Sequence, residues 1–163
     1  MTVKPIVTWP SPSLRQKADT VTEFNQSLEE LIQDLKDTLA AHKAIGIAAN
    51  QIGDTRSVCI VKVQDQDVVL VNPTIVKSSS SVSATREGCI SFPDLYESIE
   101  RPSEVTVSYQ DVTSAMQELS LSELSAKCVQ HEIDHLNGKV FLDSLSRLKK
   151  SLITKKMQKW GWI

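Results

Sequence analysis

The stretch Cys128-Val129-Gln130-His131-Glu132-Ile133-Asp134-His135-Leu136-Asn137-Gly138 contains the pattern His-Glu-x-x-His. On a helix, residues four apart lie one turn from each other on the same face, so His131 and His135 can bind one divalent metal ion. Glu132 then lies near a water on that ion and can take up its proton. The alternative is a surface helix with two unrelated histidines, because short motifs also arise by chance.

The residues around this pattern also favour a helix. Ser120-Leu121-Ser122-Glu123 has the spacing of a capping box, which predicts that the helix starts there, and Gly138 suits its C-terminal end. Two stripes at helical spacing, one with the histidines and one apolar, predict that the helix is buried. They consist of Leu124, Cys128, His131 and His135, and of Val129, Ile133 and Leu136. Buried histidines need polar partners, and a metal ion supplies them.

A complete metal site needs a third ligand, and the two common protease classes with this motif take it from further along the chain. Here no Glu follows Glu132, and Phe141 occupies the position at which one class carries a third His. We therefore expect the third ligand upstream of the helix. Cys89, beside Gly88, is the preferred candidate. Cys128 is the alternative, although it would have to share one helix face with both histidines.

The composition predicts one globular domain, residues 1–163, located in the cytoplasm. The chain has 163 residues and a formal net charge of -2 at pH 7, so no specific nucleic-acid site is expected. The sequence has no apolar run long enough to cross a membrane, and its N-terminus does not resemble a signal peptide. The three cysteines, Cys59, Cys89 and Cys128, are widely spaced, which argues against a disulfide framework.

Periodicity elsewhere predicts an α+β fold with largely antiparallel strands. The expected elements are a helix from about Asn25 and strands at residues 57–63, 67–72 and 105–109, the second of which ends at Pro73. Residues 5–15 contain three prolines, which is typical of an extended segment. Small residues fill positions 44–53, so another backbone can approach closely there.

The last segment, residues 144–163, is predicted to form a basic amphipathic helix. Its apolar side is expected to consist of Leu145, Leu148, Leu152, Ile153, Met157 and Trp160. Its basic residues are Arg147, Lys149, Lys150, Lys155, Lys156 and Lys159. The simpler interpretation of the basic side is a solvated helix face. The alternative is contact with an anionic surface, for which the ribosome is the expected partner.

Three stretches of the chain together resemble the three motifs of peptide deformylases in sequence, order and spacing. They are Gly46-Ile47-Ala48-Ala49-Asn50-Gln51, Glu87-Gly88-Cys89-Ile90-Ser91 and Gln130-His131-Glu132-Ile133-Asp134-His135-Leu136. The resemblance implies an α+β fold in which antiparallel sheets surround a central metal-binding helix. It also implies that the substrates are N-formylmethionyl peptides of nascent chains, from which the formyl group is removed.

The resemblance assigns a role to each matching residue. The implied metal ligands are Cys89, His131 and His135, and the implied metal is Fe(2+), for which zinc, nickel or cobalt can substitute. Glu132 is implied as the general base and acid. The Gln51 amide and the Ile90 backbone N–H are implied as donors to the oxyanion.

The substrate is expected to contact Ala44, Ile45, Gly46, Gly88, Leu124 and Lys127. Ala44 departs from the family, which usually has Gly there, and Lys127 replaces an aliphatic residue in the expected methionine pocket. A lysine ammonium in an apolar pocket is costly unless it is paired or reaches water. The alternatives to a deformylase are therefore a secondary copy with altered acyl or peptide specificity, a metal-stabilised relative with little activity, or an endopeptidase.

Overall fold

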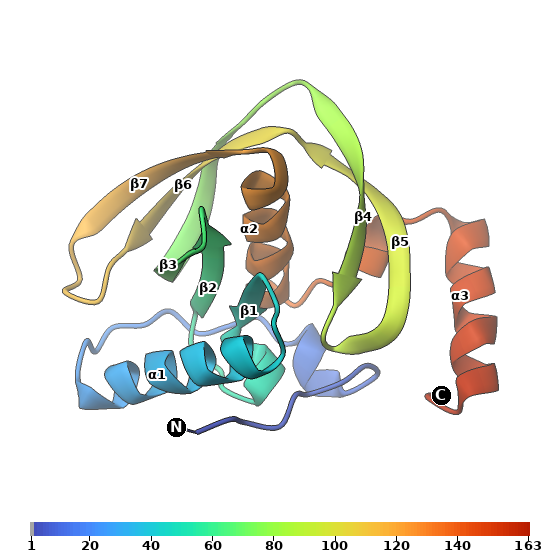
Figure 1. The fold of residues 1–163 in the computed structure, drawn as a ribbon, viewed down its shortest axis with the longest axis horizontal. Coiled ribbons are helices and arrows are strands. Elements are labelled where there is room, and N and C mark those ends of the chain that lie inside the picture. Colours follow the sequence, from blue (N-terminus) through green and yellow to red (C-terminus); the bar gives the residue numbers. More distant parts are fainter. Residues whose placement is uncertain (1) are drawn as a thin grey trace.

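Helix α2 (Glu123–Leu136) is the centre of the molecule in the computed structural model, which describes residues 2–163. It stands between a five-stranded sheet and a two-stranded hairpin (Figure 1). Helix α1 (Gln26–Ala41) lies beneath the larger sheet, and α3 (Arg147–Trp160) lies beyond the hairpin. The expected α+β fold, with antiparallel sheets around a central helix and a C-terminal helix, is confirmed.

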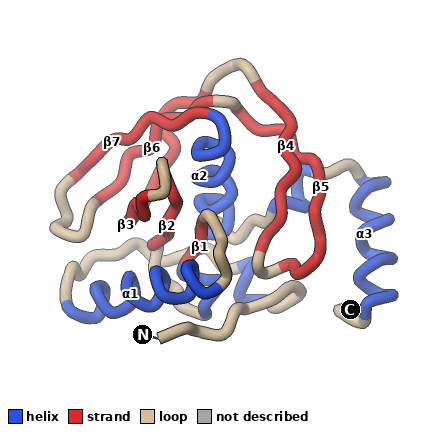
Figure 2. The backbone as a smooth tube through the Cα atoms, viewed as in Figure 1, coloured by secondary structure: helices blue, strands red, loops and turns tan. Residues whose placement is uncertain are grey.

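The strands form two sheets in which every pairing is antiparallel (Figure 2). The larger sheet has the order β1 (Gly46–Ala48), β2 (Val58–Val63), β3 (Gln66–Ser78), β6 (Glu104–Gln110) and β7 (Met116–Ser122). The hairpin consists of β4 (Val82–Cys89) and β5 (Phe92–Pro102). Short 3-10 turns are formed by η1 (Pro12–Arg15), η2 (Ala49–Ile52) and η3 (Phe141–Ser144).

Strand β2 shows how the larger sheet holds α2 in place. Its side chains alternate between the two faces, so Cys59 and Val61 pack in the cluster that includes α2. Val58 and Ile60 pack on the other face, in the cluster that includes α1. Because both faces are covered, this strand is apolar throughout, and Cys59 is a core residue as its neighbours predicted.

The predicted start of the central helix at Ser120 is wrong. Ser120 and Ser122 belong to β7, where they pair with Thr106 and Glu104, and α2 begins only at Glu123. The side chain of Ser122, the N-cap residue, makes no capping hydrogen bond. Strand pairing with a distant segment therefore overrides the local capping signal.

The predicted end of a strand at Pro73 is also wrong, because β3 continues to Ser78. The pairing of β3 with β6 shifts between Val71 and Thr74, and Asn72 has a positive φ of 51°. Proline is tolerated at such a bulge because the ladder hydrogen bond it cannot donate is already interrupted there.

Helix α3 is present, but its apolar side is only partly covered. Ile153 and Met157 are buried against the β4–β5 hairpin, whereas Leu148, Leu152 and Trp160 are exposed. Within residues 2–163, no helix is both long enough and apolar enough to span a membrane.

Candidate metal centre and active site

Three predicted ligands meet at one point of the fold. The ligand atoms of Cys89, His131 and His135 all lie within 4.8 Å of one another, and Cys89 Sγ is 3.3 Å from His135 Nε2. The other two cysteines are engaged elsewhere, since Cys59 lies in the sheet core and Cys128 Sγ donates to the Ile45 carbonyl. The hairpin therefore brings an upstream thiol close to the two histidines of α2.

The end of β4 sets the position of Cys89. The register of β4 against β5 shifts between Gly88, which pairs with Tyr96, and Cys89, which pairs with Phe92. A Cβ atom on Gly88 would lie only 2.4 Å from the Tyr96 ring. Glycine at this position therefore lets the ring pack directly on the backbone that carries the thiol.

A largely buried chain of charged groups fixes the orientation of the His131 ring. His131 Nδ1 donates to Glu87 Oε1 at 2.9 Å, and Arg101 donates to both oxygens of Glu87 at 2.6 and 3.0 Å. Arg101 also donates to Asp134 at 2.8 Å, which returns the chain to α2. Burial alone would raise the pKa of Glu87, but the hydrogen bonds from His131 and Arg101 hold it below its ordinary value. Because Nδ1 is occupied, His131 presents Nε2 to the site.

The sequence analysis did not predict that Glu87, Arg101 and Asp134 hold His131 in place. Glu87 lies two residues before Cys89 on the same strand, so both side chains leave the same face. This spacing is the one signal that could have placed Glu87 beside the ligands. Arg101 offered no such signal, because its contact depends on the pairing of β4 with β5.

We expect Arg101→Met to destabilise the fold strongly. The substitution leaves Glu87 buried without its cation, and removing one partner of a buried ion pair costs roughly 3 to 5 kcal/mol. Urea unfolding measures the loss. Arg86→Met on the same hairpin is the matched control, because Arg86 is exposed and contacts the Tyr96 ring without an ion pair. An equal loss of unfolding free energy in both variants would show that the buried ion pair contributes no more to stability than the exposed Arg86 does.

His135 is fully buried, and burial lowers its pKa well below the usual range. The imidazole is therefore neutral, with a nitrogen lone pair available to a metal ion. Its backbone carbonyl accepts a hydrogen bond of 2.7 Å from the side chain of Asn50. Asn50 thus attaches the turn that carries Gln51 to the end of α2, a contact that the sequence did not reveal.

Glu132 lies between the ligands without joining them. Its Oε1 is buried and has no hydrogen-bond partner among the described residues. A Cβ atom on Gly46 would lie 2.6 Å from Glu132 Oε2 and 2.7 Å from Cys128 Sγ, so the absence of a side chain makes room for the carboxyl group. Burial raises the pKa of Glu132 to about 7. A carboxyl group with that pKa can both accept and release a proton near neutral pH.

Gln51 is held in one orientation. Its Oε1 accepts from the Ala48 backbone N–H at 2.9 Å, while Nε2 donates to Ser91 Oγ at 3.0 Å. The same nitrogen lies 3.4 Å from Cys89 Sγ. The Gln51 side chain is buried, so it is not free to turn toward solvent. Ile90 follows Cys89 directly, and its N–H as an oxyanion donor stays a prediction.

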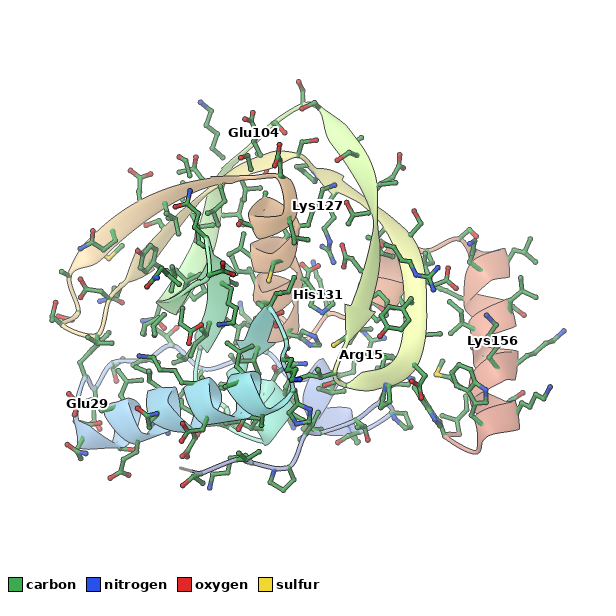
Figure 3. All side chains as sticks on the ribbon, in the orientation of Figure 1. Arg15, Glu29, Glu104, Lys127, His131 and Lys156 are labelled. Carbon is green, nitrogen blue, oxygen red and sulfur yellow. The ribbon has the colours of Figure 1, made fainter. Side chains whose placement is uncertain are left out.

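A cavity of about 620 Å³ opens over this group. All six residues that we expected to contact a substrate line it, together with Cys89, His131 and Glu132: Ala44, Ile45, Gly46, Gly88, Leu124 and Lys127. Ile45 and Leu124 are exposed at the rim, whereas Lys127 is buried. Figure 3 shows Lys127 one turn from His131, between α2 and β4. Their roles in substrate binding remain proposals.

The sequence model of the family described as "Polypeptide deformylase" matches residues 3–151. The chain belongs to the polypeptide deformylase family. It is 40% identical to a peptide deformylase of Brucella suis biovar 1 over 98% of this chain and 94% of that protein. It is 39% identical to a peptide deformylase of Agrobacterium fabrum over 98% of this chain and 96% of that protein.

Solved deformylase structures share the fold over almost the whole chain. The crystal structure of a peptide deformylase from Legionella pneumophila superposes with a TM-score of 0.91 at 36% identity, covering 98% of this chain and 96% of that one. The peptide deformylase from Ehrlichia chaffeensis, in complex with actinonin, gives a TM-score of 0.92 at 33% identity and covers 98% of each chain. The family that the three motifs indicated is thus confirmed.

Proposed function

We propose that this chain is a metal-dependent amide hydrolase that removes the formyl group from the N-terminal formylmethionine of nascent proteins. The observation that carries the proposal is the cavity lined by Cys89, His131 and Glu132, with His135 buried within ligand distance of the first two. This arrangement would place a metal ion and a proton acceptor side by side in one cavity. Membership of the deformylase family gives the substrate class.

The donor set fits a divalent transition metal. A thiolate and two imidazoles suit iron, zinc, nickel and cobalt, and we propose Fe(2+) as the native ion. Cys89 Sγ, His131 Nε2 and His135 Nε2 are the atoms that would hold it. When bound, the ion supplies Lewis-acid chemistry, which lowers the pKa of a water molecule and polarises a carbonyl oxygen.

Side chains and backbone groups of the protein itself transfer the proton and stabilise the developing negative charge. Glu132 accepts a proton from the water that attacks the formyl carbon and passes it to the leaving amine, so formate and a free N-terminus are released. Gln51 Nε2 and the Ile90 N–H donate to the formyl oxygen as negative charge develops on it. Since Ala48 and Ser91 already fix the Gln51 side chain, little reorganisation is needed.

The substrate backbone is proposed to pair with the free edge of β1. Strand β1 is an outer strand of its sheet and, within residues 2–163, pairs with no strand other than β2, and Gly46 at its start lines the cavity. An extended peptide can add to such an edge through main-chain hydrogen bonds. This places the peptide alongside the ligands while its side chains remain free to enter the cavity.

Contact with the ribosome through α3 is a further part of the proposal. Lys155, Lys156 and Lys159 are exposed and line a hollow with Leu152. Basic side chains beside an apolar one suit an anionic surface with some apolar character. Co-sedimentation with ribosomes at low and high salt tests the contact, which should weaken as salt screens the charges.

Release of formate from formyl-Met-Ala-Ser by anaerobically purified, iron-loaded protein tests the proposed function. We expect rapid hydrolysis of this peptide and none of casein. Cleavage of casein would support the endopeptidase alternative. No turnover of the formylated peptide by fully metal-loaded protein would contradict the proposal and support a relative with little activity.

We expect the iron-loaded protein to lose activity in air faster than the nickel- or cobalt-loaded protein. The proposed ligands include an oxidisable thiolate, and ferrous iron can activate oxygen beside it. Half-lives of formate release in air, measured for the three metal forms, check this. Matching half-lives would remove the basis for an iron preference.

A further inference from the structure

Two basic side chains that have no role in the proposed mechanism line the same cavity from different parts of the chain. Lys43 lies in the connection from α1 to β1, and Arg86 lies on β4. Both residues are exposed, and neither makes an ion pair among the described residues. Their charges are therefore free to act on a ligand that enters the cavity.

The negative charges of the cavity do not balance these cations. Among the described lining residues, Asp94 is the one exposed carboxylate. Glu87 is buried and accepts hydrogen bonds from His131 and Arg101, and Glu132 is buried as well. The accessible surface of the cavity is thus basic, although the whole chain has a formal net charge of -2. Such a surface favours anionic groups.

Arg86 is held at the cavity by an aromatic ring. Its guanidinium carbon lies 5.3 Å from the centroid of the Tyr96 ring, and Tyr96 also lines the cavity. The ring packs closely on Gly88, where a Cβ atom would overlap it. A guanidinium that lies over a ring keeps the N–H groups along its edge free, and these can bind a carboxylate at two points.

The end of α1 accounts for only one of the two cations. Lys43 follows His42, the C-cap residue, and a cation there offsets the partial negative charge of the helix end. Arg86 is in the middle of a strand, so no helix end explains its charge. Two unrelated elements therefore present the same charge to one cavity.

The course of β1 indicates which part of a bound peptide would lie near these cations. Strand β1 leads directly into η2, where Gln51 Nε2 lies 3.4 Å from Cys89 Sγ. The start of β1 is the end that lies toward Lys43, three residues earlier in the chain. A peptide with its formyl end at the ligands therefore runs antiparallel to β1, and its later residues approach Lys43. Arg86 likewise lies three residues before Cys89.

We propose that Lys43 and Arg86 form a rim subsite that favours acidic side chains at the second and third residues of the formylated peptide. The inference rests on the proposed function, in which the peptide pairs with the edge of β1. Three residues of extended chain span at most about 10 Å, and the third residue of an extended peptide lies about 7 Å beyond its first. The long side chains of Lys43 and Arg86 cover that range.

Two series of formylated peptide amides test this proposal. They are formyl-Met-Ala-X and formyl-Met-X-Ala, with X as Glu, Gln or Lys, and the amide removes the terminal carboxylate. We expect kcat/KM in at least one series to be about threefold to tenfold higher for Glu than for Gln at low salt, as two exposed charge pairs warrant. Lys should be the poorest. The difference should lie in KM, because the charges are remote from the reacting atoms, and it should shrink in about 0.5 M salt.

Variants of the two cations assign the preference to the rim subsite. In the double variant Lys43→Gln with Arg86→Gln, the ratio of kcat/KM for Glu to that for Gln should fall close to one, while the Gln peptides are cleaved as before. Lys43→Glu should invert the ratio, so that Lys becomes the preferred residue. Lys139→Gln is the matched control, because Lys139 is exposed and does not line the cavity. It should keep the native ratio.

Two outcomes would overturn the proposal. One is equal kcat/KM for the Glu and Gln peptides in both series with the native enzyme. The other is a preference for Glu that survives in the double variant. Failure of the proposed function is distinguishable, because then the native enzyme hydrolyses no peptide of either series.

Discussion

Cys89→Ser is expected to abolish tight metal binding and, with it, formate release. Within residues 2–163, Cys89 is the one thiol grouped with both histidines, and a serine hydroxyl is a far poorer ligand for a transition metal than a thiolate. Elemental analysis of protein purified without air measures the metal content per chain. The expected result is a fall from near one equivalent to near zero.

The other two cysteines are the matched controls for metal content. Cys59 is fully buried in the sheet core, and the Cys128 thiol donates to the Ile45 carbonyl, with its pKa raised well above the ordinary value by burial. Cys59→Ser and Cys128→Ser should therefore retain the metal. Equal metal content in all three variants would exclude Cys89 as a ligand.

Glu132→Gln should slow turnover by at least about a hundredfold while metal and substrate still bind. Glutamine keeps the shape of the side chain but cannot accept a proton, and a positioned proton carrier typically contributes about a hundred- to ten-thousandfold. Turnover is measured by formate release, metal by elemental analysis and substrate binding by calorimetry. Glu123→Gln, an exposed residue of the same helix, is the control for a general effect of the substitution.

Two outcomes would contradict this assignment. Loss of metal in Glu132→Gln would make the carboxyl group structural, although it has no partner among the described residues. Unchanged turnover would move the proton transfer to another residue and break the proposed mechanism.

The central helix and its ligands could be predicted because the information is local. The spacing of His131 and His135 follows from the helix repeat alone, and the lack of a downstream ligand directed attention to Cys89. The supporting contacts could not be predicted in the same way. Arg101 reaches Glu87 only because β4 and β5 pair in one register, and a change of register by one residue would turn either side chain to the other face.

Lys127 shows the same limit in the substrate cavity. From the sequence, a lysine in a methionine pocket suggested altered specificity, because its partners were unknown. In the structure its ammonium group donates to two backbone carbonyls of the hairpin. The acceptor residues, Ser83 and Arg101, precede Lys127 in the sequence by 44 and 26 residues. Paired in this way, the lysine is compatible with an apolar substrate side chain.

The mistaken start of the helix at Ser120 has a similar cause, since β7 pairs there with β6.

The metal dependence is tested by titrating metal-free protein with ferrous ion under anaerobic conditions, with formate release from formyl-Met-Ala-Ser as the readout. We expect the rate to rise in proportion to added metal, to stop rising at about one equivalent per chain, and to return to zero when a chelator removes the ion. A full rate in the metal-free protein, or no rate at any metal content, would contradict it.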